Sequence, residues 1–392
     1  MKRDEYAPPS SSENISGAEG KASAATAWPA FAAKILALLR YASANILLIL
    51  ACVALYAGGL APWLVVVPAL LFASFADEAA GDDDQSLAEN ECLFCILNLY
   101  MTIPLVMSLA VLLARFAGAH QGFTDRPLEL IGAIWLAGYL FALVGATVAH
   151  EFTHRAGDVS RLAAHILLGF TFNGSFVIYH IYVHHRQVGT YNDASTARRG
   201  ELLRTFLART LVQQFKQAAD IEAARLNKNG QPVWSLHNRM IQAHIPAAII
   251  LIAAGLIGGS MGFFAVLIAG IVGRLFHELI NFVQHYGVVR VEGTPIRPHH
   301  SWDCYRSISN SLHFNLPRHS DHHMFASRPF WQLHAGQPAP MLPYGYQTMA
   351  FIVLTPPLWR RIVKPLLADW DARFATQAEL AVVRERGWEG SY

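Results

Sequence analysis

Long apolar stretches dominate the pattern of hydrophobic and polar positions along this chain. Six of them approach the roughly 20 residues that a helix needs to cross a bilayer, and they cover residues 41–58, 61–77, 95–116, 129–149, 241–258 and 261–282. Because unpaired backbone groups are costly in lipid, such stretches form helices rather than open sheets. The pattern therefore predicts an all-α integral membrane protein with six transmembrane helices.

A seventh apolar run, residues 162–178, is shorter and contains Gly169, Asn173 and Gly174. Histidine-rich segments flank it on both sides, and a membrane crossing here would place them in opposite compartments. We therefore expect a re-entrant or protein-buried helix. Both histidine-rich segments then remain on one side of the membrane.

Composition supports one membrane domain preceded by a tail. Residues 1–27 are mostly small and polar, so we expect a disordered tail there and a membrane domain over residues 28–392. Of all residues, 53% are hydrophobic and 15% are charged, whereas soluble domains have roughly 25% charged residues. The net charge of +2 does not indicate nucleic-acid binding, and four scattered cysteines exclude a disulfide-rich scaffold.

The basic residues predict the orientation in the membrane. With a cytoplasmic N-terminus and six spans, 27 of the 30 lysines and arginines lie on the cytoplasmic side, which is the side that basic residues prefer. The three exceptions are Arg115, Arg126 and Arg274. We therefore expect both termini and the histidine-rich segments on the cytoplasmic face of a bacterial-type inner membrane.

Nine of the 18 histidines fall into four groups beside the predicted spans. The groups are His150 with His154, then His180 with His184 and His185, then His285 alone, and finally His319 with His322 and His323. A spacing of three or four residues places two imidazoles on one helical face, where both can reach one metal ion. Nine rings suit two metal ions, and oxygen chemistry would favour iron over zinc.

Two features of these groups need separate interpretation. His285 has no histidine three or four positions away, but it follows the sixth span at the depth where His150 ends the fourth. We therefore predict that it too is a ligand. The HEFTH run at residues 150–154 also fits a zinc protease with Glu151 as general base. That mechanism needs only one further ligand, so an intramembrane zinc protease is the remote alternative.

Further motifs surround the histidines. They are DASTARRGE at residues 193–201, NFVQHYG at 281–287, PHHSW at 298–302 and RHSDHH at 318–323. With these motifs the chain resembles the membrane-bound alkane 1-monooxygenases, within the wider group of integral-membrane di-iron desaturases and hydroxylases. The resemblance covers about residues 33–370.

The resemblance implies a histidine-rich di-iron lobe on the cytoplasmic side, with two non-haem iron ions and O2 as cosubstrate. It implies hydroxylation of an unactivated C–H bond, a terminal methyl, in a hydrophobic substrate such as a medium- or long-chain alkane. The electrons would come from a rubredoxin with its reductase, because no haem-attachment or dinucleotide-binding motif is present in the chain.

Some positions depart from the family pattern. The first histidine motif is HEFTHR, Tyr179 precedes His180 where the family has a glutamate, and Gln284 stands at another family glutamate. None of these departures removes a histidine. They leave the substrate open, so a fatty-acyl desaturase or hydroxylase and an aryl-methyl, xylene-type monooxygenase remain alternatives.

Several polar residues are candidates to orient the metal-binding histidines by hydrogen bonding to the ring nitrogen that does not bind the metal. Proximity and resemblance favour Glu151, Asp193 and Asp321 in this role, since metal-bound imidazoles need acceptors for their second nitrogen. Further candidates near the third histidine group are Asn281 and Gln284.

Other residues have interpretations that stay open at this point. The pair His299 and His300 is either an outer support of the metal site or purely structural. The pair Arg274 and Glu278 in the sixth span is either an internal ion pair or a proton path. Ala69 in the second span, if it faces inward, would leave room for a long substrate chain.

Overall fold

The computed structural model describes residues 24–84, 86 and 92–390. Most of the predicted N-terminal tail, residues 1–23, lies outside the described residues, and the first helix already begins at Ala24. The described chain is built of helices and connecting turns, with two isolated β-bridges.

Five helical segments are long and apolar enough to cross a membrane. They are Leu38–Ala57 within α1 (Ala24–Ala57), α2 (Ala61–Ala80), α3 (Leu93–Gly118), the continuous run Pro127–Thr153, and α10 (Arg239–His285). The run from Pro127 comprises α4 (Pro127–Leu140), a π-helical segment η1 (Phe141–Ala146) and α5 (Thr147–Thr153). These segments confirm the all-α integral membrane architecture.

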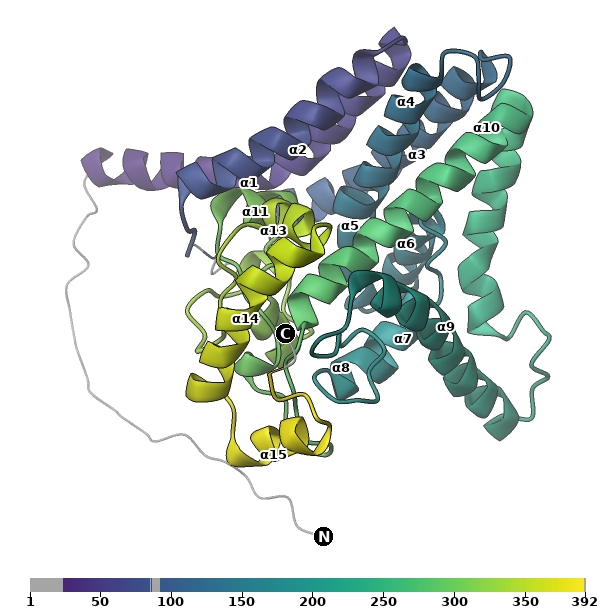
Figure 1. The fold of residues 1–392 in the computed structure, drawn as a ribbon. Coiled ribbons are helices and arrows are strands. Elements are labelled where there is room, and N and C mark those ends of the chain that lie inside the picture. Colours follow the sequence, from purple (N-terminus) through teal and green to yellow (C-terminus); the bar gives the residue numbers. More distant parts are fainter. Residues whose placement is uncertain (1–23, 85, 87–91, 391–392) are drawn as a thin grey trace.

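The element α10 contains both of the last two predicted spans. It has 47 residues, and its backbone leaves the helical conformation at Gly258 and Gly259, so that Figure 1 shows two limbs meeting at an acute angle. Gly259 has a φ of 61°, and a Cβ on Gly258 would lie 1.9 Å from the backbone oxygen of Ala114. Glycine therefore permits both the turn and the close contact with α3. The total of six spans stays a prediction.

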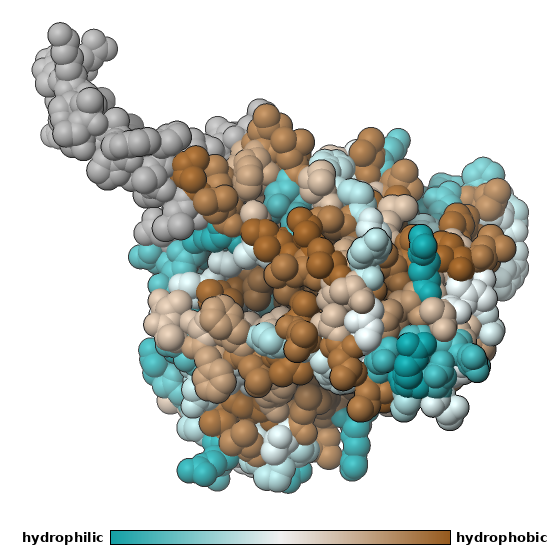
Figure 2. Space-filling model, turned by 90° about the horizontal axis from the view of Figure 1, so that it is seen from above, coloured by the Kyte–Doolittle hydropathy of each residue, from teal (hydrophilic) through white to brown (hydrophobic). Residues whose placement is uncertain are grey.

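The outer surface of the long helices is strongly apolar. Leu64 on α2 is 76% exposed, Phe75 is 75% exposed and Leu256 on α10 is 84% exposed. Figure 2 shows apolar side chains over much of one face of the molecule. An apolar surface of this extent suits contact with lipid rather than water.

The seventh apolar run forms short buried helices. It contains most of α6 (Asp158–Gly169) and ends in α7 (Phe176–Tyr179). With 12 residues, α6 is shorter than a bilayer crossing requires, and Leu167 and Leu168 on it are fully buried. The expectation of a protein-buried helix is thus confirmed.

The remaining helices form a lobe at one end of the membrane helices, which we call the histidine lobe (residues 150–238 and 286–390). Figure 1 shows α9 on one side of it and α13 to α15 on the other. A second apolar core, which includes Trp302, Tyr346 and Trp359, holds this lobe on the end of α10. Its elements are α8 (His185–Gln187), α9 (Leu203–Lys228), η3 (Pro298–His300), α11 (Ser307–Leu312), α12 (His319–Met324), η4 (Phe330–Gln332), α13 (Tyr346–Val353), α14 (Pro356–Arg373) and α15 (Gln377–Glu385).

Candidate metal centre

The nine histidines singled out by the sequence converge into two groups. Group A consists of His150, His154, His180, His185 and His322. Group B consists of His184, His285, His319 and His323. In each group, ligand nitrogens from the different rings lie within 4.8 Å of one another. The solitary His285 is therefore brought to three other histidines.

The nitrogen spacing fits metal binding better than hydrogen bonding alone. In group A, Nε2 of His180 lies 2.9 Å from Nε2 of His154 and 3.0 Å from Nε2 of His185. In group B, Nε2 of His319 lies 3.0 Å from that of His285 and 3.1 Å from that of His323. Two imidazole nitrogens bound at right angles to one ion, each at about 2.1 Å, lie roughly 3.0 Å apart. The residues thus fit a centre with two metal ions.

The protonation states of the rings also fit this interpretation. Burial, followed by the neighbouring His184, lowers the pKa of His154 to about 4. Burial and the other histidines hold the pKa values of His180, His185, His322 and His323 well below 6.5. These rings are therefore neutral at pH 7, which is the form that binds a metal ion.

The partition of the second histidine motif differs from the sequence-based expectation. A spacing of four residues was expected to place His180 and His184 at one metal ion, but His184 belongs to group B. Residues His180–His184 form a π-helical turn, η2. Because a π-helix repeats over about five residues, His180 and His185 share a face and His184 points elsewhere.

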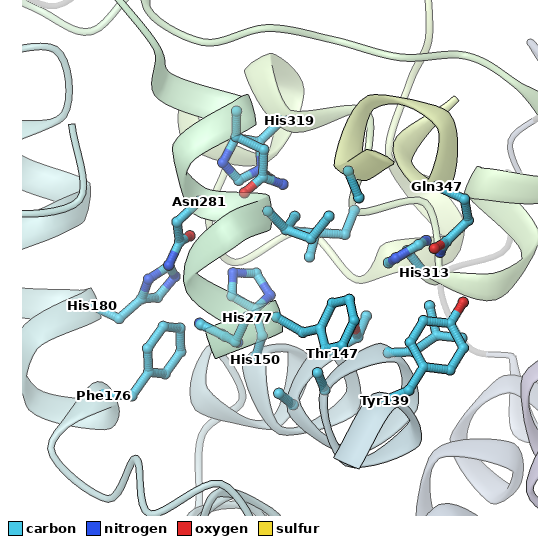
Figure 3. A pocket seen from close by; sticks show the side chains of 18 of the residues that line it. Tyr139, Thr147, His150, Phe176, His180, His277, Asn281, His313, His319 and Gln347 are labelled. Atoms are coloured by element: carbon cyan, nitrogen blue, oxygen red, sulfur yellow. Dashed lines mark hydrogen bonds between the residues drawn. The ribbon is translucent and has the colours of Figure 1, made fainter. Parts of the chain in front are cut away.

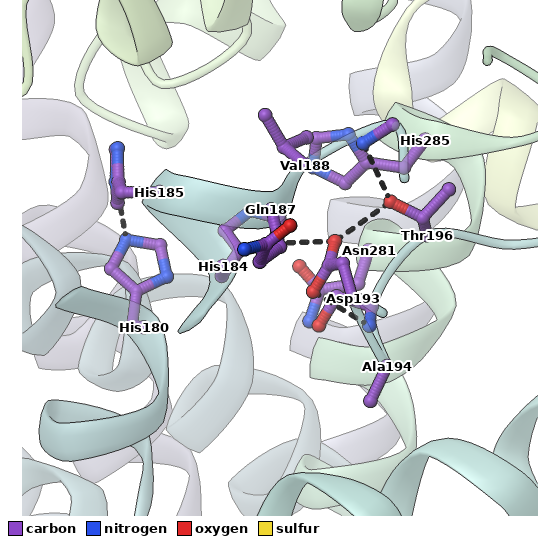
Figure 4. Close-up of polar contacts among 12 residues, drawn as sticks. His180, His184, His185, Gln187, Val188, Asp193, Ala194, Thr196, Asn281 and His285 are labelled. Atoms are coloured by element: carbon purple, nitrogen blue, oxygen red, sulfur yellow. Dashed lines mark hydrogen bonds and ion pairs between the residues drawn. The ribbon is translucent and has the colours of Figure 1, made fainter. Parts of the chain in front are cut away.

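Asp193 contacts a histidine of group B from behind, as expected. Its Oδ2 lies 3.0 Å from Nδ1 of His184 and accepts a hydrogen bond from Oγ1 of Thr196 at 2.7 Å (Figure 4). The hydroxyl of Tyr179 also donates to this carboxylate. Although burial opposes ionisation, His184 and these donors lower the pKa of Asp193. A carboxylate here would keep the proton of His184 on Nδ1 and leave Nε2 free for a metal.

Gln284 and Asn281 lie near the site but make weaker contacts with it. Nε2 of Gln284 lies 3.5 Å from Nδ1 of His319 and 2.9 Å from the hydroxyl oxygen of Tyr346. Asn281 donates to Oε2 of Glu278 at 3.2 Å. Gln284 is thus in contact with one ring of group B, whereas Asn281 contacts none of the nine rings by a hydrogen bond.

The other two candidate carboxylates pair with arginines instead of histidines. Oε1 of Glu151 accepts a hydrogen bond from Arg155 at 2.8 Å. Asp321 accepts two bonds from Arg328, at 2.6 and 2.8 Å, and one from the backbone N–H of His334 at 3.0 Å. Among their hydrogen bonds within the described ranges, none reaches an imidazole. Their position next to a ligand in the sequence does not bring them behind its ring.

The two open pairs now have definite partners. Nε2 of His300 lies 2.7 Å and Nε2 of His299 lies 3.3 Å from Oε1 of Glu379, which lies in the first turn of α15. Arg274 forms an ion pair of 2.9 Å with Glu278 inside the sixth predicted span. His299 and His300 thus link η3 to α15, apart from groups A and B.

A pocket adjoins both histidine groups (Figure 3). Its wall comes mainly from α4, η1, α5 and α10, with smaller parts from the histidine lobe. Ala69 on α2 does not belong to this wall, so its expected role as a channel residue has no support from the pocket. The lining residues are Tyr139, Ala142, Leu143, Ala146, Thr147, His150, Phe176, His180, His184, Phe276, His277, Ile280, Asn281, Gln284, His313, Leu316, His319, Gln347 and Ala350.

Sequence reasoning did not find most of the pocket. Tyr139, His313 and Gln347 stand in no motif with metal-ligand spacing, and an apolar wall looks like any other helix face in the sequence. Among the lining residues outside the histidine motifs, His277 could have been noticed, because a histidine inside an apolar span often has a function.

A sequence model of the fatty acid desaturase family matches residues 125–352. The match covers more than half of the chain and includes all nine histidines of the two groups. The chain belongs to the fatty acid desaturase family. Membership agrees with the two histidine groups and with the apolar helices that carry them.

Within this family the chain is similar to monooxygenases. Alkane 1-monooxygenase 1 of Pseudomonas aeruginosa is 33% identical over 286 residues, which are 71% of this chain and 74% of that protein. Alkane 1-monooxygenase 2 of the same species is 31% identical over 326 residues, 79% of this chain and 85% of that protein. The xylene/toluene monooxygenase hydroxylase component XylM of Pseudomonas putida is 30% identical over 363 residues, 89% of this chain and 95% of that protein. This family member is therefore an alkane 1-monooxygenase-like oxidoreductase of the membrane.

Proposed function

We propose that the protein hydroxylates an unactivated C–H bond of a hydrophobic substrate, using O2 and a centre of two iron ions. The observation that carries the proposal is the convergence of nine histidines into groups of five and four, with members of both groups on the wall of one pocket. In the overall reaction, R–H, O2, two electrons and two protons give R–OH and water. Two bound iron ions would supply the reductive activation of O2 that a closed-shell ion such as zinc does not.

Group A would hold one iron ion and group B the other. Asp193 would fix the tautomer of His184 through Nδ1, and Gln284 would serve His319 in the same way. With its amide turned so that Oε1 faces both partners, Gln284 would accept one hydrogen bond from Nδ1–H of His319 and another from the hydroxyl of Tyr346. Neutral imidazoles and one nearby amide in place of a carboxylate keep the negative charge of this ligand shell low.

The chain itself would bind and orient the substrate. The pocket wall contains Leu143, Phe176, Phe276 and Ile280 together with histidines of both groups. A hydrocarbon chain held by this wall lies with a C–H bond near the metals, and bulk water is excluded from it. Because hydrocarbons partition into lipid, the substrate would enter from the bilayer.

The names of the relatives favour two substrate classes, terminal alkanes and methyl-substituted arenes. The alkane 1-monooxygenases and XylM both match most of this chain. A zinc protease is disfavoured because its single ion would leave most of the nine rings without a role, and Glu151 is held by Arg155. A desaturase on the same metals would yield a double bond and no alcohol.

We further propose that a separate small electron carrier, a rubredoxin with its reductase, delivers the electrons on the cytoplasmic side of the inner membrane. The orientation in the membrane is supported by the 27 of 30 basic residues that fall on the predicted cytoplasmic side. The surplus of basic residues in the histidine lobe would steer an acidic partner protein toward this lobe.

One experiment tests the proposal directly. The purified protein is loaded anaerobically with Fe(II) or with Zn(II), supplied with rubredoxin, its reductase and 18O2, and given octane and para-xylene. We expect about two iron ions per chain and an alcohol that contains 18O from the iron-loaded protein, with none from the zinc-loaded protein. An alkene without alcohol, or full activity with zinc, would refute the proposal.

A further inference from the structure

The pocket is not apolar throughout, and its polar end lies away from the metal histidines. Figure 3 shows Tyr139, His313 and Gln347 at one end of the pocket, while His150 and His180 lie toward the other. A hydrocarbon would need none of these three polar side chains. Their chemistry therefore bears on what the substrate carries at the end that is not oxidised, an inference that rests on the proposed function.

Tyr139 presents a buried hydroxyl that has no partner among the described residues. Its side chain is 3% exposed, and its hydroxyl has no hydrogen-bond partner in the part of the chain that the structure describes. The ring is held edge-on by Phe276 at a centroid distance of 5.6 Å, which fixes the direction of the hydroxyl. Buried hydroxyl groups are normally paired, so this one is a donor awaiting an acceptor.

His313 presents an acceptor at the same end of the pocket. Its Nδ1 lies 3.0 Å from the backbone oxygen of Ser309, and because a carbonyl only accepts, Nδ1 must carry the proton. Burial lowers the pKa of this ring to about 4 even though the bond to Ser309 opposes the shift, so the ring is neutral at pH 7. Nε2 is therefore left with a free lone pair.

The charge balance of the pocket selects among polar groups. No lysine, arginine, aspartate or glutamate is among the described residues that line it. A carboxylate would be desolvated there without a cation, at a large cost. A neutral hydroxyl has no such cost, and it can accept a hydrogen bond from Tyr139 while donating one to Nε2 of His313. The amide of Gln347 offers a further donor and acceptor.

We propose that the substrate is a neutral, largely hydrocarbon molecule that carries a hydroxyl group at the end remote from the C–H bond to be oxidised. Tyr139 and His313 bind this hydroxyl and so set which carbon reaches the metals. Octane and other plain alkanes are then poorer substrates than alcohols of the same length, and the product of a primary alcohol is a diol.

The first test compares three substrates of equal length with the iron-loaded protein and its electron donors: nonane, 1-octanol and octanoate. We expect kcat/KM for 1-octanol to exceed that for nonane by about tenfold or more, because a site built to bind a hydroxyl discriminates against its absence. Octanoate should be the poorest of the three. Equal values for 1-octanol and nonane, or a preference for octanoate, would overturn the inference.

A variant separates binding in the pocket from partition into detergent. Tyr139→Phe removes one oxygen, and it should lower the ratio of kcat/KM for 1-octanol to that for nonane by about tenfold. Partition of the two substrates is the same for both proteins and cancels in this comparison. Thr348→Val is the matched control, since it removes an unpartnered buried hydroxyl on α13 that does not line the pocket. Its ratio should equal that of the wild type, and an unchanged ratio in Tyr139→Phe would overturn the inference.

Direct binding keeps this inference distinct from the proposed function. Metal-free protein in detergent should bind tritiated 1-octanol with a Kd about tenfold lower than the Kd of Tyr139→Phe, whether or not turnover occurs. If no substrate is hydroxylated but this difference is found, the proposed function fails and the hydroxyl site stands. If alkanes are hydroxylated and binding of 1-octanol is the same in both proteins, the hydroxyl site fails alone.

Discussion

Oδ2 of Asp193 lies 3.0 Å from Nδ1 of His184, and both side chains are almost fully buried. The carboxylate thus faces the nitrogen that points away from group B. An imidazole whose Nδ1–H is held by a carboxylate has a fixed tautomer and a more basic Nε2. Group B therefore has a carboxylate behind one of its rings. Among the described hydrogen bonds of the five rings in group A, none involves a carboxylate.

We predict that Asp193→Asn weakens metal binding at group B by about 10- to 100-fold, because the amide keeps the shape of the side chain but loses its charge. The measurement is competition with a chelator, followed by metal analysis of the protein. Asp369→Asn is the control, since the side chain of Asp369 is 46% exposed and forms an ion pair with Arg373. Equal metal affinity in both variants would show that the contact does not tune the ligand.

His285→Ala should lower the iron content below two ions per chain and abolish product formation, while the protein still inserts into the membrane. The reason is that His285 supplies one of only four rings in group B. A matched control is His244→Ala on the same helix, because His244 bonds to the backbone oxygen of Met240 and belongs to neither group. Full iron occupancy with continued turnover in His285→Ala would limit the ligands to the other eight histidines.

Glu379→Gln tests whether His299 and His300 support the metals or the lobe. The carboxylate accepts bonds from both rings through Oε1 and from Oγ1 of Thr376 through Oε2 at 2.9 Å. We expect the variant to lose about 1–3 kcal/mol of stability while it retains both metal ions, because a buried charge-assisted bond is lost and neither His299 nor His300 belongs to group A or group B. Denaturant unfolding and metal analysis measure the two effects. A loss of metal with unchanged stability would assign these histidines to the metal centre.

The contribution of Asp303 to the stability of the histidine lobe should fall as the pH rises from about 4 to about 6, opposite in sign to the contribution of the buried neutral histidines. Burial raises the pKa of Asp303 from 3.8 to about 6, although bonds from the backbone and hydroxyl of Ser320 lower it. Between these values the folded protein holds a proton that the unfolded chain releases, so rising pH favours unfolding, by about 3 kcal/mol in total. Asp303→Asn removes this contribution, so the free energy of unfolding of the wild type minus that of the variant should fall by this amount between pH 4 and pH 6 in chemical denaturation.

A second variant checks the sign of this effect. Ser320→Ala removes the hydroxyl that donates to Asp303 and thereby removes one cause that lowers its pKa. The fall of the Asp303 contribution should then extend to a higher pH than in the wild type. A profile that shifts to lower pH would mean that another group is responsible.

Eight of the nine candidate ligands could be found from the sequence because they depend on residue type and on local spacing, whereas His285 is inferred from its position after the sixth predicted span. His150 lies in α5 and His154 caps the C-terminus of that helix four residues later, and the two share group A as the spacing predicts. The apolar spans could be found for a similar reason, since hydropathy over about 20 residues needs no knowledge of neighbours.

What could not be predicted depends on contacts between distant segments. The π-helical turn at His180–His184 changes which rings share an ion, and local spacing does not reveal it. Glu151 and Asp193 look alike beside their motifs, yet only Asp193 reaches a ring, because the chain after His185 folds back under His184. The sequence does not show that Tyr139 lines a pocket, because this pocket forms where α4 meets α10 and the histidine lobe.

The two histidine groups share chain segments, so metal ions bound in them would be coupled. The segment at His180–His185 gives two rings to group A and one to group B, and α12 gives His322 to group A and two rings to group B. An ion bound in one group therefore orders chain segments that also carry ligands of the other group, and the entropy lost in ordering them is lost only once. The second ion should consequently bind more tightly than the first. Metal loading then becomes positively cooperative, so that a partly loaded preparation contains mainly empty and fully occupied molecules rather than mononuclear ones.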